Sequence, residues 1–139
     1  MATLQDVIAR IQTVVGGITD IRKAPATAEE AMNVFPYAVC YPGSGAVVMG
    51  VYGPARMEIT HTVVLEVHVA RKDLPRDISA VRGFVDSIPN ELFEDATLNS
   101  KAITIPEIRY SFRTFEWGEG TDTIGYRFEI DVIQYTDVT

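Results

Sequence analysis

Two histidines, His61 and His68, are the residues best suited to acid–base or metal chemistry. They lie seven positions apart in a stretch that alternates apolar and polar residues, which predicts a strand, and an odd spacing on a strand places side chains on opposite faces. The pair is therefore not expected to share a metal ion, and no C-x-x-C or H-x-x-x-H spacing offers another site. We expect His61 to be partly buried with its polar atoms satisfied, and His68 to be solvated.

The possible nucleophiles and glycine-rich segments do not match catalytic patterns. Cys40 lies between Val39 and Tyr41 in a predicted strand, where a small core side chain is expected. Ser44 lies in Pro42-Gly43-Ser44-Gly45, which lacks the glycines two positions before and after a nucleophilic serine and fits a turn. The segment 118–120 (Gly-Glu-Gly) is too short to hold a phosphate, which its glutamate would repel. We therefore expect a protein that is not an enzyme and uses no cofactor or metal ion.

The charge of the chain is unevenly distributed. Its 139 residues include 19 acids and 12 bases, a formal net charge of −7. Residues 116–139 contain one base, Arg127, and six acids: Glu116, Glu119, Asp122, Glu129, Asp131 and Asp137. Glu116 and Glu119 could in principle act as an acid–base pair, but a strand end and a loop are ordinary places for solvated acids. Such a chain is a poor general binder of phosphate backbones, which need clustered lysine and arginine.

The segment Arg109-Tyr110-Ser111-Phe112-Arg113 interleaves bases with aromatic residues, as single-stranded nucleic-acid binders do. On a strand, however, Tyr110 and Phe112 point away from Arg109 and Arg113, so we expect the aromatic rings on the core face. Binding of a single strand by Arg109 and Arg113 remains an alternative, and it would weaken with added salt.

The periodicity of the chain predicts a mixed fold in one domain, residues 1–139. The composition, 47% apolar and 22% charged, is that of a globular domain. No apolar run reaches the roughly 18–20 residues that span a bilayer, and no signal peptide is evident, so we expect no membrane association. Helical spacing covers 4–16, with Thr3 and Asp6 as a capping pair, and 75–88, ended by Pro89. Strand patterns cover 36–41, 46–52, 57–71, 103–117 and 123–135, with turns at 42–45 and 53–54, and no clear period at 19–35.

The expected order is α-β-β-β-α-β-β. It predicts an α+β two-layer sandwich in which two main helices cover a mainly antiparallel sheet of about five strands.

Four stretches of the chain resemble one family of viral structural proteins. They are the proline-bounded strand and turn at 35–43, the strand end and corner at 67–75, the helix end at 85–98, and the glycine loop and last strand at 120–130. In order, length and local sequence they are similar to the tail terminator (tail completion, minor tail) proteins of long-tailed bacteriophages.

The resemblance implies a fold, an assembly and a location. Such proteins are small α+β domains that form a hexameric ring on the head-proximal end of the tail tube, where they stop tube polymerisation and offer a surface to a head–tail connector or stopper protein. DNA passes through the lumen without specific binding, and there is no cofactor or catalysis. The expected location is the virion tail, after assembly in the host cytoplasm.

The charge of the chain is compatible with such a ring. Six copies at −7 would carry −42, and an acidic lumen would let DNA slide by like-charge repulsion. The turns at 42–45 and 53–57 are candidate docking loops, in which Arg56 could pair with an acid on a neighbour. The candidate lumen residues are Glu116, Glu119, Asp122, Glu129 and Asp131.

Two further alternatives remain open. The protein could be another neck component, such as a stopper or joining protein, which only stoichiometry and partner would distinguish. It could instead be a small dimeric ligand-binding or enzymatic α+β domain with a pocket between sheet and helices.

Overall fold

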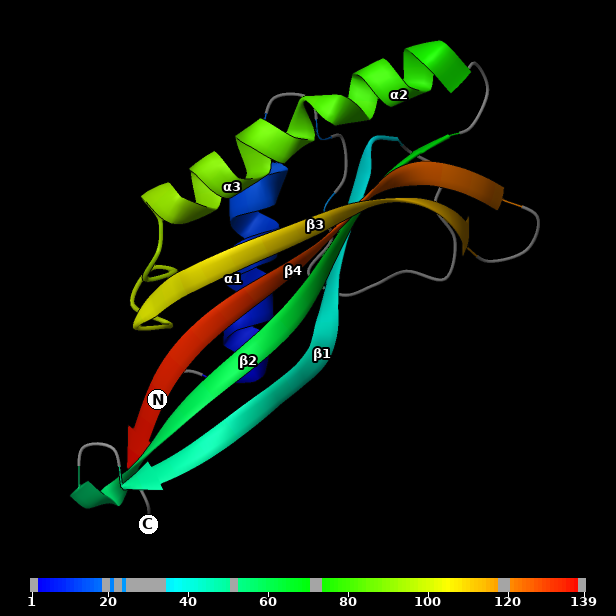
Figure 1. Ribbon diagram of the computed structural model, residues 1–139. Coiled ribbons are helices and arrows are strands. Elements are labelled where there is room, and N and C mark those ends of the chain that lie inside the picture. Colours follow the sequence, from blue (N-terminus) through cyan, green and yellow to red (C-terminus); the bar gives the residue numbers. More distant parts are fainter. Residues whose placement is uncertain are drawn as a thin grey trace.

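The computed structural model describes residues 3–18, 21, 24, 35–50, 53–70, 74–117 and 121–137. The expected irregular region at 19–35 lies almost wholly outside them. Three helices lie on one face of a four-stranded, fully antiparallel sheet in the order β1-β2-β4-β3 (Figure 1). The elements are α1 (Leu4–Gly16), β1 (Tyr37–Gly50), β2 (Gly53–Ala70), α2 (Leu74–Arg82), α3 (Phe84–Glu94), β3 (Thr104–Trp117) and β4 (Thr121–Asp137). The expected α+β sandwich is confirmed, with four strands rather than five.

Helix α1 begins where the sequence predicted. The Thr3 hydroxyl accepts a hydrogen bond from the Asp6 amide at 3.2 Å, and the Asp6 carboxylate accepts one from the Thr3 amide at 2.8 Å. These two bonds satisfy groups that a helix start otherwise leaves unpaired, and the backbone bond lowers the pKa of Asp6. The apolar stripe of α1 then packs on the sheet, with Val7, Ile11 and Val15 fully buried.

The turn predicted at 42–45 is wrong, because the strands expected at 36–41 and 46–52 form the single strand β1. The register shifts between Pro42 and Ser44, which marks a bulge in which Gly43 has no partner on β2. A side-chain carbon on Gly43 would lie 2.4 Å from the Thr62 carbonyl oxygen, so the bulge needs glycine. Pro42 is tolerated because β1 is an edge strand. The turn expected at 53–54 is also wrong, since β2 already begins at Gly53.

The helix predicted to end at Pro89 instead breaks earlier and continues further. It divides at Gly83 into α2 and α3, and Pro89 lies inside α3. Proline within a helix costs about 3 kcal/mol. Burial of Phe84, Ile88 and Leu92 offsets that cost, because each such side chain contributes about 1.5–3 kcal/mol.

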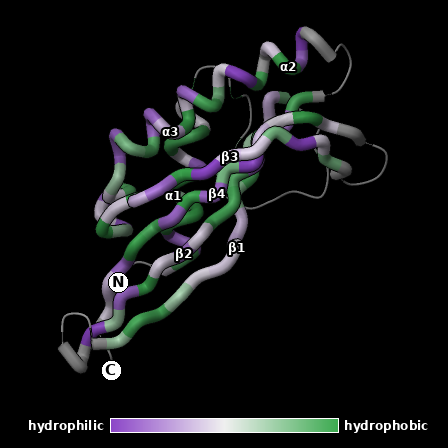
Figure 2. The backbone as a smooth tube through the Cα atoms, in the orientation of Figure 1, coloured by the Kyte–Doolittle hydropathy of each residue, from purple (hydrophilic) through white to green (hydrophobic). Residues whose placement is uncertain are grey.

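The main core lies between the helices and the facing side of the sheet. Val63, Leu65 and Val67 of β2 pack there with Phe128 and Ile130 of β4, all fully buried. This alternation along β2 and β4 is the one expected from the sequence. Figure 2 shows apolar positions along the strands beneath the helices and also along the lower part of β1, beyond the helices.

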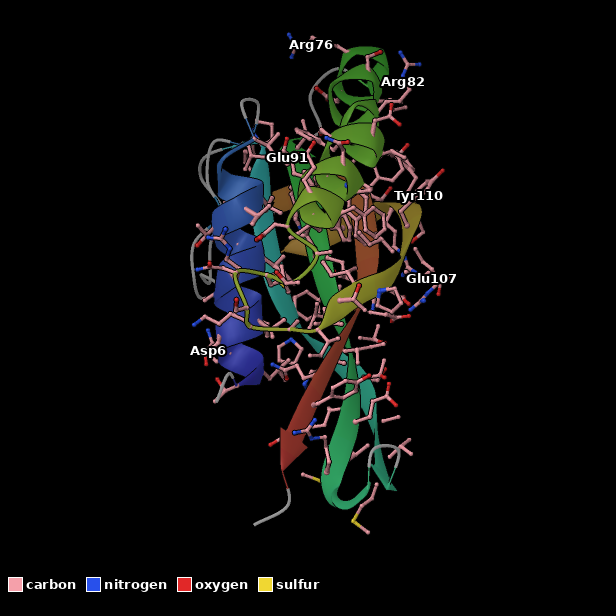
Figure 3. All side chains as sticks on the ribbon, turned by 90° about the vertical axis from the view of Figure 1, so that its left-hand side faces the viewer. Asp6, Arg76, Arg82, Glu91, Glu107 and Tyr110 are labelled. Carbon is pink, nitrogen blue, oxygen red and sulfur yellow. The ribbon has the colours of Figure 1, made fainter. Side chains whose placement is uncertain are left out.

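The hairpin of β1 and β2 extends beyond the helices. We call residues 44–50 and 53–60 the arm. Leu4, at the start of α1, lines a recess with Pro42, Gly45 and Thr62, so α1 reaches only the base of the arm. Figure 3 shows the arm continuing past Asp6 at that end of α1.

One glycine fixes how closely the two central strands approach. A side-chain carbon on Gly125 of β4 would lie 1.6 Å from the Val67 carbonyl oxygen of β2. Glycine inside a strand commonly marks such a close backbone approach.

We expect Gly125→Ala to lower the free energy of unfolding by at least about 3 kcal/mol, because the methyl group can fit only if the strands separate. Gly83→Ala is the matched control. Gly83 has helical backbone angles, and an added carbon there meets nothing within 4 Å. The control should gain about 0.5–1 kcal/mol. Urea unfolding checks both, and equal effects of the two variants would contradict the close approach.

Candidate functional site

The helix-free face of the sheet carries a network of charged side chains centred on Arg109 of β3. The guanidinium donates two hydrogen bonds to Asp131 of β4, at 2.8 and 3.0 Å, and one to Glu107 at 2.5 Å. It also lies 3.5 Å from Glu129. The Thr62 hydroxyl of β2 donates to Asp131 Oδ1 at 2.8 Å, which extends the network across three strands.

This network pairs two of the predicted lumen acids, Asp131 and Glu129, with Arg109. The bond from Arg109 lowers the pKa of Asp131, against the opposing effect of burial, and the Thr62 hydroxyl lowers it further. The carboxylates of Asp131 and Glu107 raise the pKa of Arg109. Asp131 and Glu129 are thus neighbours, as a common site would require, but they share an arginine instead of presenting free negative charge.

The other predicted site residues are spread along the sheet. Arg56 is exposed, lies in the arm and is opposite Asp137 in the β2–β4 register. Glu116 and Asp122 are register partners close to the β3–β4 turn, and Glu119 lies outside the described residues. From Asp122 to Asp131 the strand advances about 30 Å. The five candidates that the structure describes therefore do not form one site within a single chain.

A second polar cluster lies buried on the helix-free face. His68 and Thr123 are fully buried, and Glu66 is 6% exposed. The His68 ring contacts Thr123 Oγ1 through Nδ1 at 2.6 Å and Glu66 Oε1 through Nε2 at 3.0 Å. The Tyr41 hydroxyl donates to the other Glu66 oxygen. Although burial raises the pKa of Glu66, the bonds from His68 and Tyr41 lower it more, and the net shift is downward.

The prediction that His68 is solvated is wrong, whereas His61 is partly buried and bonded to Gln134 at 2.9 Å, as expected. The ring of Phe115 from β3 covers His68, with centroids 4.2 Å apart. The sequence signal was the i, i+2 spacing of Glu66 and His68, which places an acid and an imidazole on one face.

The series of carboxylate, imidazole and hydroxyl in Glu66, His68 and Thr123 is the kind that can activate a nucleophile. Here His68 and Thr123 have no exposed surface, so a substrate atom cannot reach them in this conformation. The cluster stabilises the sheet by satisfying buried polar groups.

Two exposed apolar surfaces lie elsewhere on the sheet. On the arm, Val47 is 60%, Val48 50% and Met49 65% exposed. On the edge strand β3, Tyr110 is 57% and Phe112 45% exposed, and both rings meet Tyr126 edge-on at 5.8 and 5.5 Å. We call these three aromatic residues the aromatic strip. They share the helix-side face with Phe128, as expected, but α3 does not cover them, and Tyr110 lies at the margin of the molecule (Figure 3).

Three surface recesses lined by described residues are small. One of about 130 Å³ lies between Ile59, the segment 100–103 and Gln134. One of about 230 Å³ lies at the base of the arm, and a third of similar volume lies among Arg109, Arg113 and Arg127. Small-molecule sites usually have volumes of at least roughly 300 Å³. Within the described part of the chain there is also no cluster of three potential metal ligands and no helix able to span a membrane.

No protein-family model matches this chain, and no curated protein has significant sequence similarity to it.

We expect Glu66→Ala to lower the free energy of unfolding by about 2–3 kcal/mol at pH 7, because it removes the carboxylate that accepts hydrogen bonds from Tyr41 and His68. Glu107→Ala is the control, since the Glu107 side chain is 60% exposed and should matter much less.

The same cluster predicts a pH dependence that Glu66→Gln reveals. The folded-state pKa of Glu66 is depressed below the ordinary 4.5. Its ionised form therefore stabilises the fold above that pH, and the advantage is lost as the pH falls through the folded-state pKa. The stability difference between the parent protein and Glu66→Gln should shrink below about pH 4.5 in urea unfolding; a difference unchanged down to pH 3 would contradict this role.

The Arg109–Asp131 pair should show favourable coupling in a double-mutant cycle of Arg109→Gln and Asp131→Asn. The double variant should lose less stability than the two single losses added together, and added salt should reduce the coupling. Additive losses at low salt would show that the bidentate pair does not form in solution.

Proposed function

We propose that the protein is a structural component of a bacteriophage virion, a tail terminator that forms a ring on the head-proximal end of the tail tube. The observation that supports this best is that, among the described residues, no strand pairs with the outer edge of β1 or of β3, and both strands carry exposed apolar residues. Val47, Val48 and Met49 lie on β1, and Tyr110 and Phe112 lie on β3. Open apolar edges favour association, and proteins that remain monomeric usually cover or charge them.

A cyclic assembly covers both edges with one repeated contact. In a heterologous interface each protomer presents two different surfaces, and the contact closes into a ring when the rotation between neighbours allows it. About six copies, as in the family that the sequence resembles, would join the tail tube protein on one side and a connector or stopper protein on the other.

The charge distribution suggests how DNA would pass such a ring. The helix-free face pairs Glu107, Glu129 and Asp131 with Arg109, so a lumen lined by this face would alternate in sign. Glu116 and Asp122, at the facing ends of β3 and β4, and Glu119, between them in the sequence, remain candidate lumen acids. Both arrangements would let DNA slide without specific binding.

Two alternatives are weakened by particular observations. A single-strand binder would need Arg109 available, but its guanidinium already contacts Glu107, Glu129 and Asp131. A small-molecule binder would need a larger recess than those described above. Another neck component would share this geometry, and its partner would distinguish it.

Two measurements test the proposal. Light scattering across a dilution series should give a mass about six times 15.4 kDa, in solution or when tail tube protein is present. Added to polymerising tail tube protein, the chain should bind one tube end and shorten the tubes in proportion to its concentration. A strict dimer that leaves tube length unchanged would contradict the proposal.

A further inference from the structure

One face of the arm is apolar, and the two valines and the methionine at its tip are half exposed or more. Residues 42–50 contain no charged side chain, in a chain that is 22% charged. Val48 lies opposite Glu58, while Val47 and Met49 lie opposite Ile59 and Met57 on the other face. An apolar face of this kind on a strand is typical of one that becomes covered, so we expect a partner on the face of Val47 and Met49.

The aromatic strip is the complementary surface of the same chain. Tyr110 and Phe112 expose about half of their area on the edge strand β3, and the rings of both pack against Tyr126. Aromatic side chains of this kind are enriched at the centres of protein interfaces.

One chain cannot bring these two surfaces together. Met49 pairs with Met57, whereas Tyr110 lies level with Phe128 and therefore with Leu65. From Met57 to Leu65 the strand advances about 27 Å, and β2 and β4 also separate β1 from β3.

We propose that the arm of one protomer packs on the aromatic strip of the next copy, with Val47 and Met49 contacting Tyr110 and Phe112. A second copy is favoured over a foreign partner because a single repeated contact covers both apolar surfaces. The contact is head-to-tail, since each surface lies on a different edge of the sheet. Its closure into a ring rests on the proposed function, whereas the contact itself does not.

Cysteine cross-linking tests the contact directly. The native Cys40 is 4% exposed and burial raises its pKa to about 12, so it should not react. A chain with Met49→Cys and Phe112→Cys should give, after mild oxidation, a ladder of covalent oligomers on a non-reducing gel. The ladder should end at the ring size. The experiment uses the full chain, free in solution and bound to tail tubes.

Matched variants define the outcomes. Met49→Cys with Glu91→Cys, an exposed position on α3 away from both surfaces, should give no ladder. Dimers from Met49→Cys alone would show arm-to-arm pairing and overturn the proposal, as would the absence of a ladder both in solution and on tubes. A ladder without any effect on tube length would support the contact and refute the terminator function. Shortened tubes without a ladder would do the reverse.

Mixing two defective variants provides a second test that does not depend on cross-linking. Val47→Asp disables the arm and Phe112→Asp disables the strip, and each variant should lose the oligomer, with its mass falling to that of one chain. Mixed together, they retain one intact contact, so light scattering should show a 1:1 dimer and nothing larger. No recovery on mixing, from variants whose circular dichroism matches the parent, would overturn the head-to-tail contact.

Discussion

The helices of this protein are too short to cover its strands, and most other features follow from that mismatch. The 13 residues of α1 extend about 20 Å, whereas the 18 residues of β2 extend about 60 Å. The main core lies where the two layers overlap, at Val63, Leu65 and Phe128. Beyond α1, no helix in the described part of the chain lies above the arm, and its two valines are therefore exposed.

On the helix-free face, polar interactions contribute to stability beside apolar burial. Hydrogen bonds and ion pairs hold it, in a buried set at Glu66 and His68 and in an exposed set at Arg109 and Asp131. The two sets depend on the cross-strand register, because each joins residues far apart in sequence. A slip of one residue along β4 would break both and would also turn the core side chains outward. The polar face therefore specifies the register that the apolar face needs.

The sequence was sufficient to predict the elements and the apolar alternation, because periodicity is a local property. It predicted α1 with its Thr3–Asp6 cap, and it placed Tyr110 and Arg109 on opposite faces. The predictions at 42–45 and at Pro89 fail because proline and glycine indicate a turn or a helix end only from their local sequence. The prediction for His68 fails because a polar residue on a strand can be buried when other polar groups bond to it. The edge position of β1, the buried face of α3 and the ring of Phe115 over His68 are long-range facts. The Arg109 network was missed because no local pattern shows that Glu107, Glu129 and Asp131 converge.

The bulge at Gly43 has a consequence for how the arm could change during evolution. Before it, Tyr37, Val39 and Tyr41 lie level with His68, Glu66 and Val64; after it, the even-numbered Ser44, Ala46 and Val48 lie level with Thr62, Thr60 and Glu58. One unpaired residue thus inverts the parity of the strand between core and arm. If Gly43 instead paired with Thr62, every later residue of β1 would move by one position and turn to the opposite face of the arm, whereas deletion of Gly43 would leave Ser44 opposite Thr62. A change that closes the bulge without removing a residue would therefore present the other face of the arm's first strand to a neighbour while the core kept its register.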